Sequence, residues 1–591
     1  MRGYRHPWIW VATPWSYTID GHYYYGEGHY FDGYNYCYNG GFHLTPPPEA
    51  VIPAAAVGPG QTPVDGSVPQ PVADTPPQPA VRKVVNMVDF VRALDPRGSH
   101  ADYVEVLKAE IELNTKYGFR NTILLQYDAL VDAEMLAMAR TADAEKTEYG
   151  LWFEMSKPLN EAAGIPWNPK HGADWQWDWF INPGFLMAYT LEQRKALIDT
   201  AFDRFKKEFG SYPRSVGSWL LDAWSMNYMV TTYGVDGFCI CREQDNTDAY
   251  GLRGGYSNGA YYPAKRNMLS AAVDMTNAIP APVFKMLTPD PIYNYANPRA
   301  LYPDYPLDRG CPTMEPVWTC GNTPKIIDWF FRVYTESPGL LNLSYMQTGQ
   351  ENSFGLRSIM MGLPSQCERI AELRDAGLIE VETLGETARR FKADHPANVP
   401  QTQVALEDWT GCGRSSVWYN CRNYRANLLL DKGRLVFRDI HKMCDDFQEP
   451  YYDTPCLGWK AEYFTPPFVD EYLHRSTNGV SGVMAFDGMF RGLKVSTPEK
   501  NVLVVEGQRT DGTYATVTLR EDSIALVGTA LDWQYAGARD FTVEPSRDGL
   551  DCSFRGYAYR IGVDGICTRT PRGLRISPMS SAPLRLRLDR R

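Results

Sequence analysis

The spacing of hydrophobic and polar positions changes along this chain of 591 residues. Between residues 82 and 400, short apolar runs alternate with stretches in which apolar side chains recur every three or four positions. The first spacing is typical of buried strands and the second of amphipathic helices. Because parallel strands need a long connection, usually a helix, this alternation predicts a parallel sheet with helical crossovers.

Seven strand-like runs are expected in this part of the chain, at 84–90, 121–130, 149–155, 214–222, 237–243, 282–290 and 340–347. Helices are expected at 102–117, 132–146, 191–209, 324–336, 365–376 and 379–393. The helix at 191–209 has the clearest pattern, because Leu197, Phe202 and Phe205 share one face with Ile198 and Ala201. Seven strand–helix units predict an α/β fold of the (β/α)7 barrel type, with residues 82–400 as the catalytic domain.

After residue 400 the apolar runs become short and alternating, separated by Gly, Asp and Pro. They fall at 414–430, 433–440, 501–506, 513–519, 523–527, 552–563 and 574–588. Strands at such close intervals are typical of an all-β sandwich. We therefore expect a β-sandwich domain over residues 401–591.

The first 81 residues differ from both of these parts. Residues 1–44 are rich in Tyr and Gly and predict a Tyr-rich hairpin; His22, His29 and His43 lie there without a recognised metal-ligand spacing. Residues 45–81 are rich in Pro, which removes backbone donors, and predict an extended linker or arm. Whether such an arm lies on its own barrel or on a neighbouring subunit is open, and so is the oligomeric state.

Charge and hydropathy exclude some classes of partner. The net charge is −11 and no basic run is present, which disfavours binding to nucleic acid. No stretch of 18 or more apolar residues occurs, which disfavours a membrane-spanning helix. The first apolar run is too short for a signal peptide, so a cytoplasmic protein is expected, although a leader removed earlier would leave the same sequence.

Aromatic residues are unusually common, with 16 Trp and 37 Tyr. Aromatic faces stack on the C–H faces of sugars, so the composition favours a carbohydrate substrate. Trp175, Trp177 and Trp179 would share one face if their segment is extended, and they form either a sugar-binding wall or rim packing. A second loop, 254–263, is rich in Gly and Tyr and contains Tyr256.

Acidic residues follow nearly every predicted barrel strand. They are Asp89, Glu154, Asp222, Glu243, Asp290 and Glu351, with Glu315 between the sixth and seventh strands. In such barrels the reactive groups gather at the carboxyl ends of the strands. Clustered carboxylates repel one another, so they indicate either a site or compensating cations such as Arg242 and Arg253. Paired carboxylates are the groups that glycoside hydrolysis requires.

Three segments resemble glycoside hydrolase family 57. Pro213–Asp222 (PRSVGSWLLD) resembles the nucleophile segment, where Trp-Leu-x-Glu ends the fourth strand. Leu343–Glu351 (LSYMQTGQE) falls where that family has its acid/base, and Gly150–Glu154 (GLWFE) resembles its third-strand motif. The resemblance covers about residues 82–400 and extends to the family 38 α-mannosidases and polysaccharide deacetylases, which share the barrel type.

The chain also departs from this pattern. Met87-Val88-Asp89 stands where the family has His-Gln-Pro, Asp222 replaces Glu, and Glu351 replaces Asp. The resemblance implies a retaining glycoside hydrolase acting on an α-linked glycan, with Asp222 as nucleophile and Glu351 as acid/base. It implies that Glu154, Glu243, Asp290 and Glu315 bind substrate hydroxyls or tune pKa values. The remaining expected substrate-binding residues are Asp89, Trp175, Trp177, Trp219, Gln350 and Tyr256.

No cofactor and no catalytic metal are expected, and a Ca²⁺ site near residues 245–248 has little support. The first alternative is a metal-dependent polysaccharide deacetylase on the related barrel, which would use an Asp and an H-x-x-x-H pair. In the barrel region only His100, His171 and His395 occur, and none has that spacing. The second alternative is a carbohydrate-binding protein without catalysis.

Overall fold

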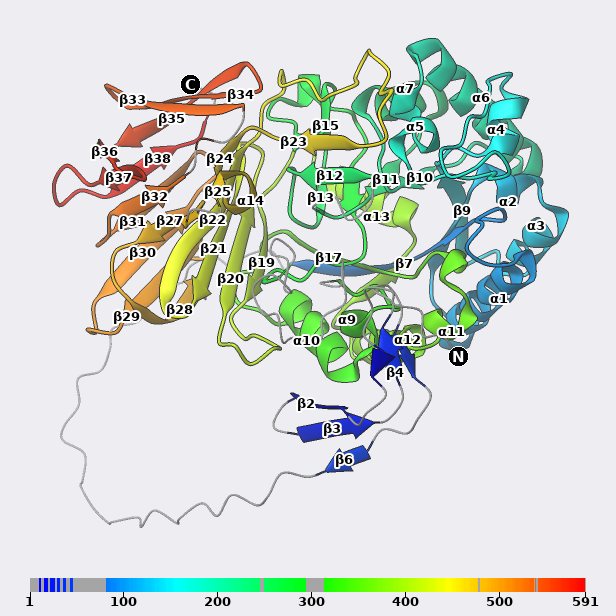
Figure 1. The fold of residues 1–591 in the computed structure, drawn as a ribbon, viewed down its shortest axis with the longest axis horizontal. Coiled ribbons are helices and arrows are strands. Elements are labelled where there is room, and N and C mark those ends of the chain that lie inside the picture. The colour runs from blue at the N-terminus through cyan, green and yellow to red at the C-terminus, as the bar shows by residue number, and fades with distance from the viewer. Residues whose placement is uncertain are drawn as a thin grey trace. The chain divides into compact units, whose positions relative to one another are not determined.

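The structure, a computed structural model, divides the chain into two compact units, Met1–Pro79 and Ala80–Arg591 (Figure 1). It describes short strands between residues 10 and 45, and residues 81–244, 249–293, 313–476, 479–535, 537 and 540–589. The proline-rich arm expected at 45–81 and the segment 245–248 lie almost wholly outside the described residues.

The first unit contains two small antiparallel sheets. One consists of β1 (Trp10–Val11), β4 (His29–Phe31) and β5 (Tyr36–Tyr38), and the other of β2 (Trp15–Ile19), β3 (His22–Gly26) and β6 (His43–Thr45). The antiparallel pairing of β2 with β3 agrees with the Tyr-rich hairpin expected there.

The second unit begins with a sheet whose central feature is seven parallel strands. They are β7 (Arg82–Val91), β8 (Asn121–Leu125), β9 (Thr147–Trp152), β10 (Ser215–Ser218), β11 (Gly237–Ile240), β16 (Val283–Lys285) and β17 (Leu343–Thr348). Their order is β16-β11-β10-β9-β8-β7-β17, and every neighbouring pair is parallel. This confirms the predicted seven-stranded parallel arrangement.

Side chains, rather than a strand ladder, bridge the described parts of the two outermost parallel strands. The Thr288 hydroxyl, just after β16, donates to the carbonyl of Gln347 at 2.9 Å and accepts from its N–H at 2.7 Å. The rings of Phe284 and Tyr345 lie 4.8 Å apart across the same gap. The sheet therefore curls into a barrel whose two edges meet.

One face of the sheet forms the interior of the barrel. A single buried cluster joins Val88 and Phe90 of β7 to residues of all but one of the other parallel strands: Leu124, Trp152, Cys239, Phe284 and Tyr345. On β10 the position that faces this cluster is Gly217. A side chain would not fit there, because a Cβ atom would lie 2.5 Å from a methyl carbon of Leu124. Because side chains alternate along a strand, the residues between these positions face the surrounding helices.

The longer helices of this region are α1 (His100–Tyr117), α6 (Leu191–Phe209), α7 (Ala223–Tyr233), α10 (Pro324–Thr335), α12 (Leu363–Asp375) and α13 (Leu384–Asp394). Helix α6 has the predicted bounds. Thr190 and Gln193 form a capping box at its start, and Gly210 ends it in a left-handed conformation. Shorter helices are α2 (Tyr127–Val131), α3 (Ala133–Ala139), α4 (Lys157–Ala162), α5 (Ile181–Gly184), α9 (Thr319–Asn322) and α11 (Leu356–Ile359).

Three expectations about single elements were wrong. The apolar run 121–130 is not one strand, because β8 ends at Leu125 and α2 follows. A buried apolar run does not by itself distinguish a strand from a helix. The helix expected at 379–393 begins at Leu384, and Glu380–Glu382 forms β18, which pairs with β7. The helix expected at 132–146 is the shorter α3.

Strands rather than a crossover helix occupy the described connection between β11 and β16. They are β12 (Tyr250–Arg253), β13 (Ala260–Tyr261), β14 (Pro263–Ala264) and β15 (Asn267–Ala271). Strand β12 pairs in parallel with β23 (Ala461–Phe464), which comes from the C-terminal part of the chain (Figure 1). The barrel and the C-terminal sheets are thus joined by backbone hydrogen bonds.

Two large antiparallel sheets form most of the C-terminal part, which also contains a two-stranded sheet of β25 (Arg475–Ser476) and β26 (Val480–Ser481). The first has the order β19-β20-β21-β22-β27-β32-β37-β36, with β24 (Pro467–Asp470) also paired to β22. Its other strands are β19 (Gln401–Ala405), β20 (Ser415–Asn420), β21 (Tyr424–Asp431), β22 (Arg434–Lys442), β27 (Met484–Phe486), β32 (Leu531–Gln534), β36 (Ile566–Thr570) and β37 (Gly573–Ser577).

The second sheet has the order β28-β29-β30-β31-β38-β35-β34-β33. Its strands are β28 (Phe490–Ser496), β29 (Leu503–Arg509), β30 (Tyr514–Leu519), β31 (Ser523–Val527), β33 (Phe541–Ser546), β34 (Gly549–Phe554), β35 (Tyr557–Asp564) and β38 (Leu584–Arg587). Both sheets contribute to one buried core, as the predicted sandwich requires. Within the described residues, no helix is both long enough and apolar enough to cross a membrane.

Candidate active site

A buried arginine lies at the centre of the charged groups at the carboxyl ends of the barrel strands. Arg92 directly follows β7 and is 1% exposed. Its Nη2 and Nε donate to Oε2 of Glu154 at 2.8 and 3.0 Å, and its Nη1 donates to Oε2 of Glu351. Glu154 follows β9 and Glu351 follows β17, so residues after three parallel strands meet on one guanidinium group.

A second arginine connects this group to the surface. Nη2 of Arg97 donates to Oε1 of Glu351 at 2.7 Å and to Asp95 at 2.5 Å, and the Arg97 side chain is 38% exposed. The Ser353 hydroxyl also donates to Oε1 of Glu351, at 2.8 Å. Both oxygens of Glu351 are therefore occupied by donors.

Trp177 closes the other side of the group. Its indole N–H donates to Oε2 of Glu154 at 3.0 Å, and its ring lies 4.5 Å from the Arg92 guanidinium carbon. A cation over an indole face is attracted by the ring quadrupole, and burial strengthens this attraction. Trp177 is 2% exposed, so it also keeps water from the ion pair between Arg92 and Glu154.

Two polar side chains that follow β8 and β9 are buried without a full set of partners. Oε1 of Glu154 has no hydrogen-bond partner among the described residues, nor has the side-chain amide of Gln126, which follows β8. Leaving such atoms unpaired costs about 1–3 kcal/mol each, so we expect water or another polar group to pair with them. Trp219, after β10, is partly exposed and packs against Trp152 at 5.6 Å, and so offers an aromatic rim at this end of the barrel.

The environments of the two carboxyl groups push their pKa values in opposite directions. Burial raises the pKa of Glu154, although Arg92 opposes this. Burial would also raise the pKa of Glu351, but Arg92 and Arg97 together hold it below its usual range. Displacement of two carboxyl pKa values in opposite directions is the pattern by which neighbouring acids divide the acid and base roles.

A third acid belongs to the same neighbourhood. Glu315 accepts from the Gln350 amide at 2.7 Å and from the indole of Trp318 at 2.8 Å. Burial raises the pKa of Glu315 to about 7, and the charge of Glu351 contributes to this rise. The Gln350 side chain also accepts from the backbone N–H of Glu351 at 2.8 Å, so it links the two carboxyl groups.

The structure thus brings together five of the residues expected at the site: Glu154, Glu351, Glu315, Gln350 and Trp177, with Trp219 at the rim. It does not bring Asp222 to this group. Asp222 is fully buried, caps α7 by accepting from the N–H and hydroxyl of Ser225 at 2.9 and 2.7 Å, and pairs with Arg194 at 3.1 Å. None of these partners contacts Glu351, and no hydrogen bond or ion pair joins Asp222 to the acids around Arg92 among the described residues.

Glu243 and Asp290 also lie in other surroundings. Glu243 accepts from Arg425 of β21 and from the N–H of Gly254 at 2.8 Å, and Arg425 helps to lower its pKa against the effect of burial. Asp290 holds a turn by accepting from the N–H of Ile292 and the indole of Trp409, both at 2.7 Å. Burial raises the pKa of Asp290 to about 6.

The other three expected residues lie outside the group as well. Asp89 lies between the inward-facing Val88 and Phe90, and it accepts from Asn114 of α1 at 3.0 Å on the helix side of the sheet. Tyr256 is fully buried and donates to the carbonyl of Val399 at 2.9 Å. The Trp175 ring stacks on His171 at 4.4 Å.

Sequence reasoning missed Arg92, Arg97 and Gln126. The first two were recognisable as part of the run Arg92-Ala-Leu-Asp95-Pro-Arg97, which follows a buried strand directly. The compensating cations expected from the sequence, Arg242 and Arg253, follow the fifth strand, whereas Arg92 and Arg97 follow the first. No comparable signal marked Gln126.

Among the described residues, one group has the spacing of metal ligands: Asp439, His441 and Asp470. It lies on β22 and β24 of the C-terminal sheet. Asp439 already accepts from Arg425 at 2.7 and 2.9 Å, and His441 bonds Asp470 at 2.9 Å, so these atoms are satisfied by protein partners.

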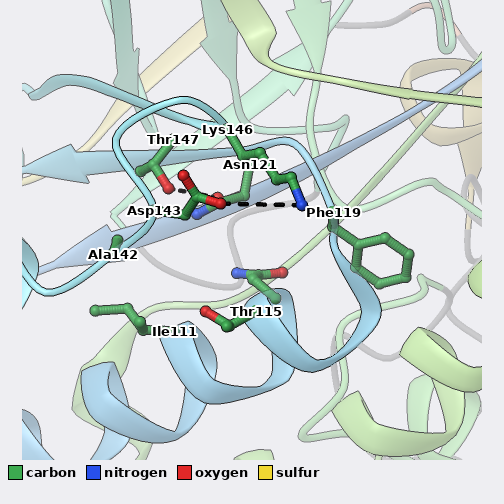
Figure 2. A pocket seen from close by; sticks show the side chains of 9 residues that line it. Ile111, Thr115, Phe119, Asn121, Ala142, Asp143, Lys146 and Thr147 are labelled. Carbon is green, nitrogen blue, oxygen red and sulfur yellow. Dashed lines mark hydrogen bonds and ion pairs between the residues drawn. The ribbon is translucent and has the colours of Figure 1, made fainter.

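A separate small hollow lies at the amino ends of β8 and β9, between these strands and α1 (Figure 2). Its lining includes Asn121, Thr147 and Ile111, and Lys146 pairs with Asp143 beside it at 3.9 Å. The volume of about 10 Å³ suffices for no more than a water molecule. This hollow is at the opposite strand ends from Glu154 and Glu351 and does not suit a substrate.

No family model matches the chain, and no curated protein sequence matches it. Among solved structures, a protein from Parabacteroides distasonis described as a glycoside hydrolase/deacetylase is 12% identical over 65% of this chain and 90% of its own, with a TM-score of 0.47. A protein from Mycobacterium smegmatis described as a polysaccharide deacetylase is 13% identical over 54% and 93%, with a TM-score of 0.31. The 4-α-glucanotransferase of Thermococcus litoralis is 9% identical over 85% and 99%, with a TM-score of 0.25. At these TM-scores the likenesses carry no conclusion about activity.

Proposed function

We propose that the protein is a carbohydrate-active enzyme that hydrolyses glycosidic bonds in a glycan. The observation that carries this proposal is the pair Glu154 and Glu351 on the guanidinium group of Arg92, with pKa values displaced in opposite directions. Glycoside hydrolysis needs one protonated carboxyl and one carboxylate beside the bond that breaks.

The pKa directions assign the two roles. In this proposal Glu154, whose pKa burial raises, is the acid that donates a proton to the leaving oxygen, and Oε1 is its oxygen without a hydrogen-bond partner among the described residues. Glu351 is ionised, and it either attacks the anomeric carbon or activates water. Arg92 positions both carboxyl groups, and Glu315 with Gln350 binds sugar hydroxyls next to them.

An α-linked substrate and a retaining outcome come from the resemblance to family 57 and form part of the proposal. Two of the three segments that carry this resemblance, Gly150–Glu154 and Leu343–Glu351, supply the two carboxyl groups. The third ends at Asp222, which caps a helix here, so Glu351 rather than Asp222 takes the nucleophile role in our proposal.

A panel of oligosaccharides tests the activity. Purified wild type would be incubated with α- and β-linked oligosaccharides and the products separated by chromatography, beside Glu154→Gln, Glu351→Gln and the control Glu161→Gln on the exposed face of α4. We expect cleavage by wild type and control and a loss of at least about 100-fold in the other two. Undiminished cleavage by both site variants would exclude the assignment.

A second candidate is a carbohydrate-binding protein without catalysis. It is favoured by one observation, the occupation of both oxygens of Glu351 by Arg92, Arg97 and Ser353. Glycan binding without released product over long incubation would select this candidate. Released acetate from an acetylated glycan would instead select the deacetylase.

A further inference from the structure

A line of touching aromatic rings runs from the surface of the molecule to the candidate active site. Trp459 stacks on Phe180 at 5.4 Å, and Phe180 lies parallel to His171 at 4.5 Å and 3°. His171 contacts Trp179 at 3.9 Å, and Trp179 contacts Trp177 at 5.9 Å. We refer to these five residues as the aromatic ladder.

The outer end of the ladder faces solvent. Trp459 is 58% exposed and Leu457, on the same loop, is 79% exposed. The loop precedes β23 and is fixed to the barrel, because the N–H of Ile181 donates to the carbonyl of Trp459 at 3.0 Å and the N–H of Cys456 donates to that of Met187 at 2.8 Å. A large aromatic side chain such as Trp459, held in solvent on a fixed backbone, is typical of a binding surface.

The middle of the ladder is held in place by polar contacts. The ring of His171 bonds Asp178 through Nδ1 at 2.8 Å, and Asp178 also accepts from the N–H groups of Lys170 and Phe180 at 2.7 and 3.1 Å. These bonds fix the orientation of the imidazole on which Phe180 stacks. A surface ordered before binding loses less entropy when a ligand settles on it.

The inner end of the ladder lies at the candidate active site. Trp177 donates to Glu154 and covers Arg92, so the ladder ends at the carboxyl group to which we assign the proton. A substrate that contacts both Trp459 and this carboxyl group would have to span the length of the ladder, whose inner ring, Trp177, is buried. The ladder is therefore continuous with the candidate active site.

We infer that Trp459 and Phe180 form an outer sugar-binding subsite, so that the substrate is a glycan chain of several units rather than a small glycoside. The faces of pyranose rings carry C–H groups that pack on aromatic rings, and Trp459, which is 58% exposed, offers the ring face that Phe180 does not cover. This inference rests on the proposed function, because that function places the inner end of the glycan beside Glu154. It assigns a substrate-binding role to a loop of the C-terminal β-sheet region.

The test measures binding separately from cleavage. Trp459→Ala, Trp459→Phe and Leu457→Ala would each be made in the Glu351→Gln background, and titrated by isothermal calorimetry with maltose, maltohexaose, cellobiose and cellohexaose. Leu457 is the matched control, because it is a more exposed apolar residue on the same loop.

In the parent protein we expect tighter binding of one hexasaccharide than of its disaccharide. Trp459→Ala should reduce this ratio of affinities at least tenfold, Trp459→Phe should largely restore it, and Leu457→Ala should leave it unchanged. Equal ratios in Trp459→Ala and the parent, or no binding of any of the four sugars, would overturn the inference. Hydrolysis by the wild type is measured independently, so binding without cleavage would refute the proposed function and retain the subsite.

Discussion

Glu154 and Glu351 bind the same guanidinium group through different nitrogens, although they follow strands that are far apart in the sequence. One arginine thereby holds two acids side by side at the end of the barrel. Arg97 adds a second positive charge on the Glu351 side only, which explains why the pKa of Glu351 is lowered while that of Glu154 is raised.

Removing Arg92 should destabilise the protein strongly. Arg92→Met leaves two buried carboxyl groups without their cation, and breaking a buried pair in this way costs about 3–5 kcal/mol. Urea unfolding measures the loss. Arg140→Met is the control, because the exposed pair of Arg140 with Glu208 contributes about 1 kcal/mol or less. Equal small losses in both variants would show that Arg92 does not compensate these acids.

The rate of cleavage should fall at both high and low pH, which gives the pH profile an alkaline and an acidic limb. As pH rises through the raised pKa of Glu154, the acid loses the proton that it must donate, and the rate falls. As pH falls through the lowered pKa of Glu351, the carboxylate is neutralised, and the rate falls again. Profiles of kcat/KM check this, and Glu154→Gln should lose the alkaline limb from its residual activity. An unchanged alkaline limb in that variant would assign it to another group, with Glu315 the first candidate.

Asp222 should matter for stability more than for chemistry. Asp222→Asn leaves Arg194 buried without its counter-charge and should lower the free energy of unfolding by about 3–5 kcal/mol. The rate per folded molecule should stay within about tenfold of the wild type, since Asp222 shares no partner with Glu351. Calorimetry and a folded-fraction-corrected kcat test both statements. A loss of a thousandfold or more in a folded variant would restore Asp222 as the nucleophile.

Asp89 should make stability fall as pH rises. Burial raises its pKa from 3.8 to about 7, so the folded state binds this proton more tightly than the unfolded state. The tighter binding of this proton contributes fully to the free energy of unfolding below pH about 4. The contribution is lost as pH rises toward 7. Asp89→Asn cannot ionise, and its advantage over wild type should grow from near zero at pH 4 to roughly 3–4 kcal/mol at pH 8. Unfolding curves at both pH values measure it, with Glu105→Gln on the exposed face of α1 as the control.

The strands and helices were predictable from sequence where the spacing was regular. Helix α6 has apolar residues on one face, a Thr190–Gln193 capping box and a Gly210 terminus, and its bounds were predicted without error. β8 and α2 share one continuous apolar run, and periodicity could not separate them. β18 is only three residues long and was absorbed into the following helix.

The site was predictable only in part, because both faces of a buried parallel strand are apolar. Because side chains alternate along a strand, Asp89 must lie on the opposite face from Val88 and Phe90. The alternation does not show which of the two faces is turned to the barrel interior. The acids after β9 and β17, which the sequence placed among the acids at the strand ends, bind one arginine in the structure. The cation that joins them, Arg92, and the helix-capping role of Asp222 depend on tertiary contacts with residues distant in sequence.

The central claim is that Glu154 donates the proton and Glu351 acts as the carboxylate. The most direct test compares kcat/KM of Glu154→Gln on an oligosaccharide and on the matching 2,4-dinitrophenyl glycoside, whose leaving group needs little protonation. We predict a loss of at least about 100-fold on the oligosaccharide and little loss on the dinitrophenyl glycoside, while Glu351→Gln loses both activities. Equal losses by Glu154→Gln on the two substrates, or no loss on either, would contradict the account.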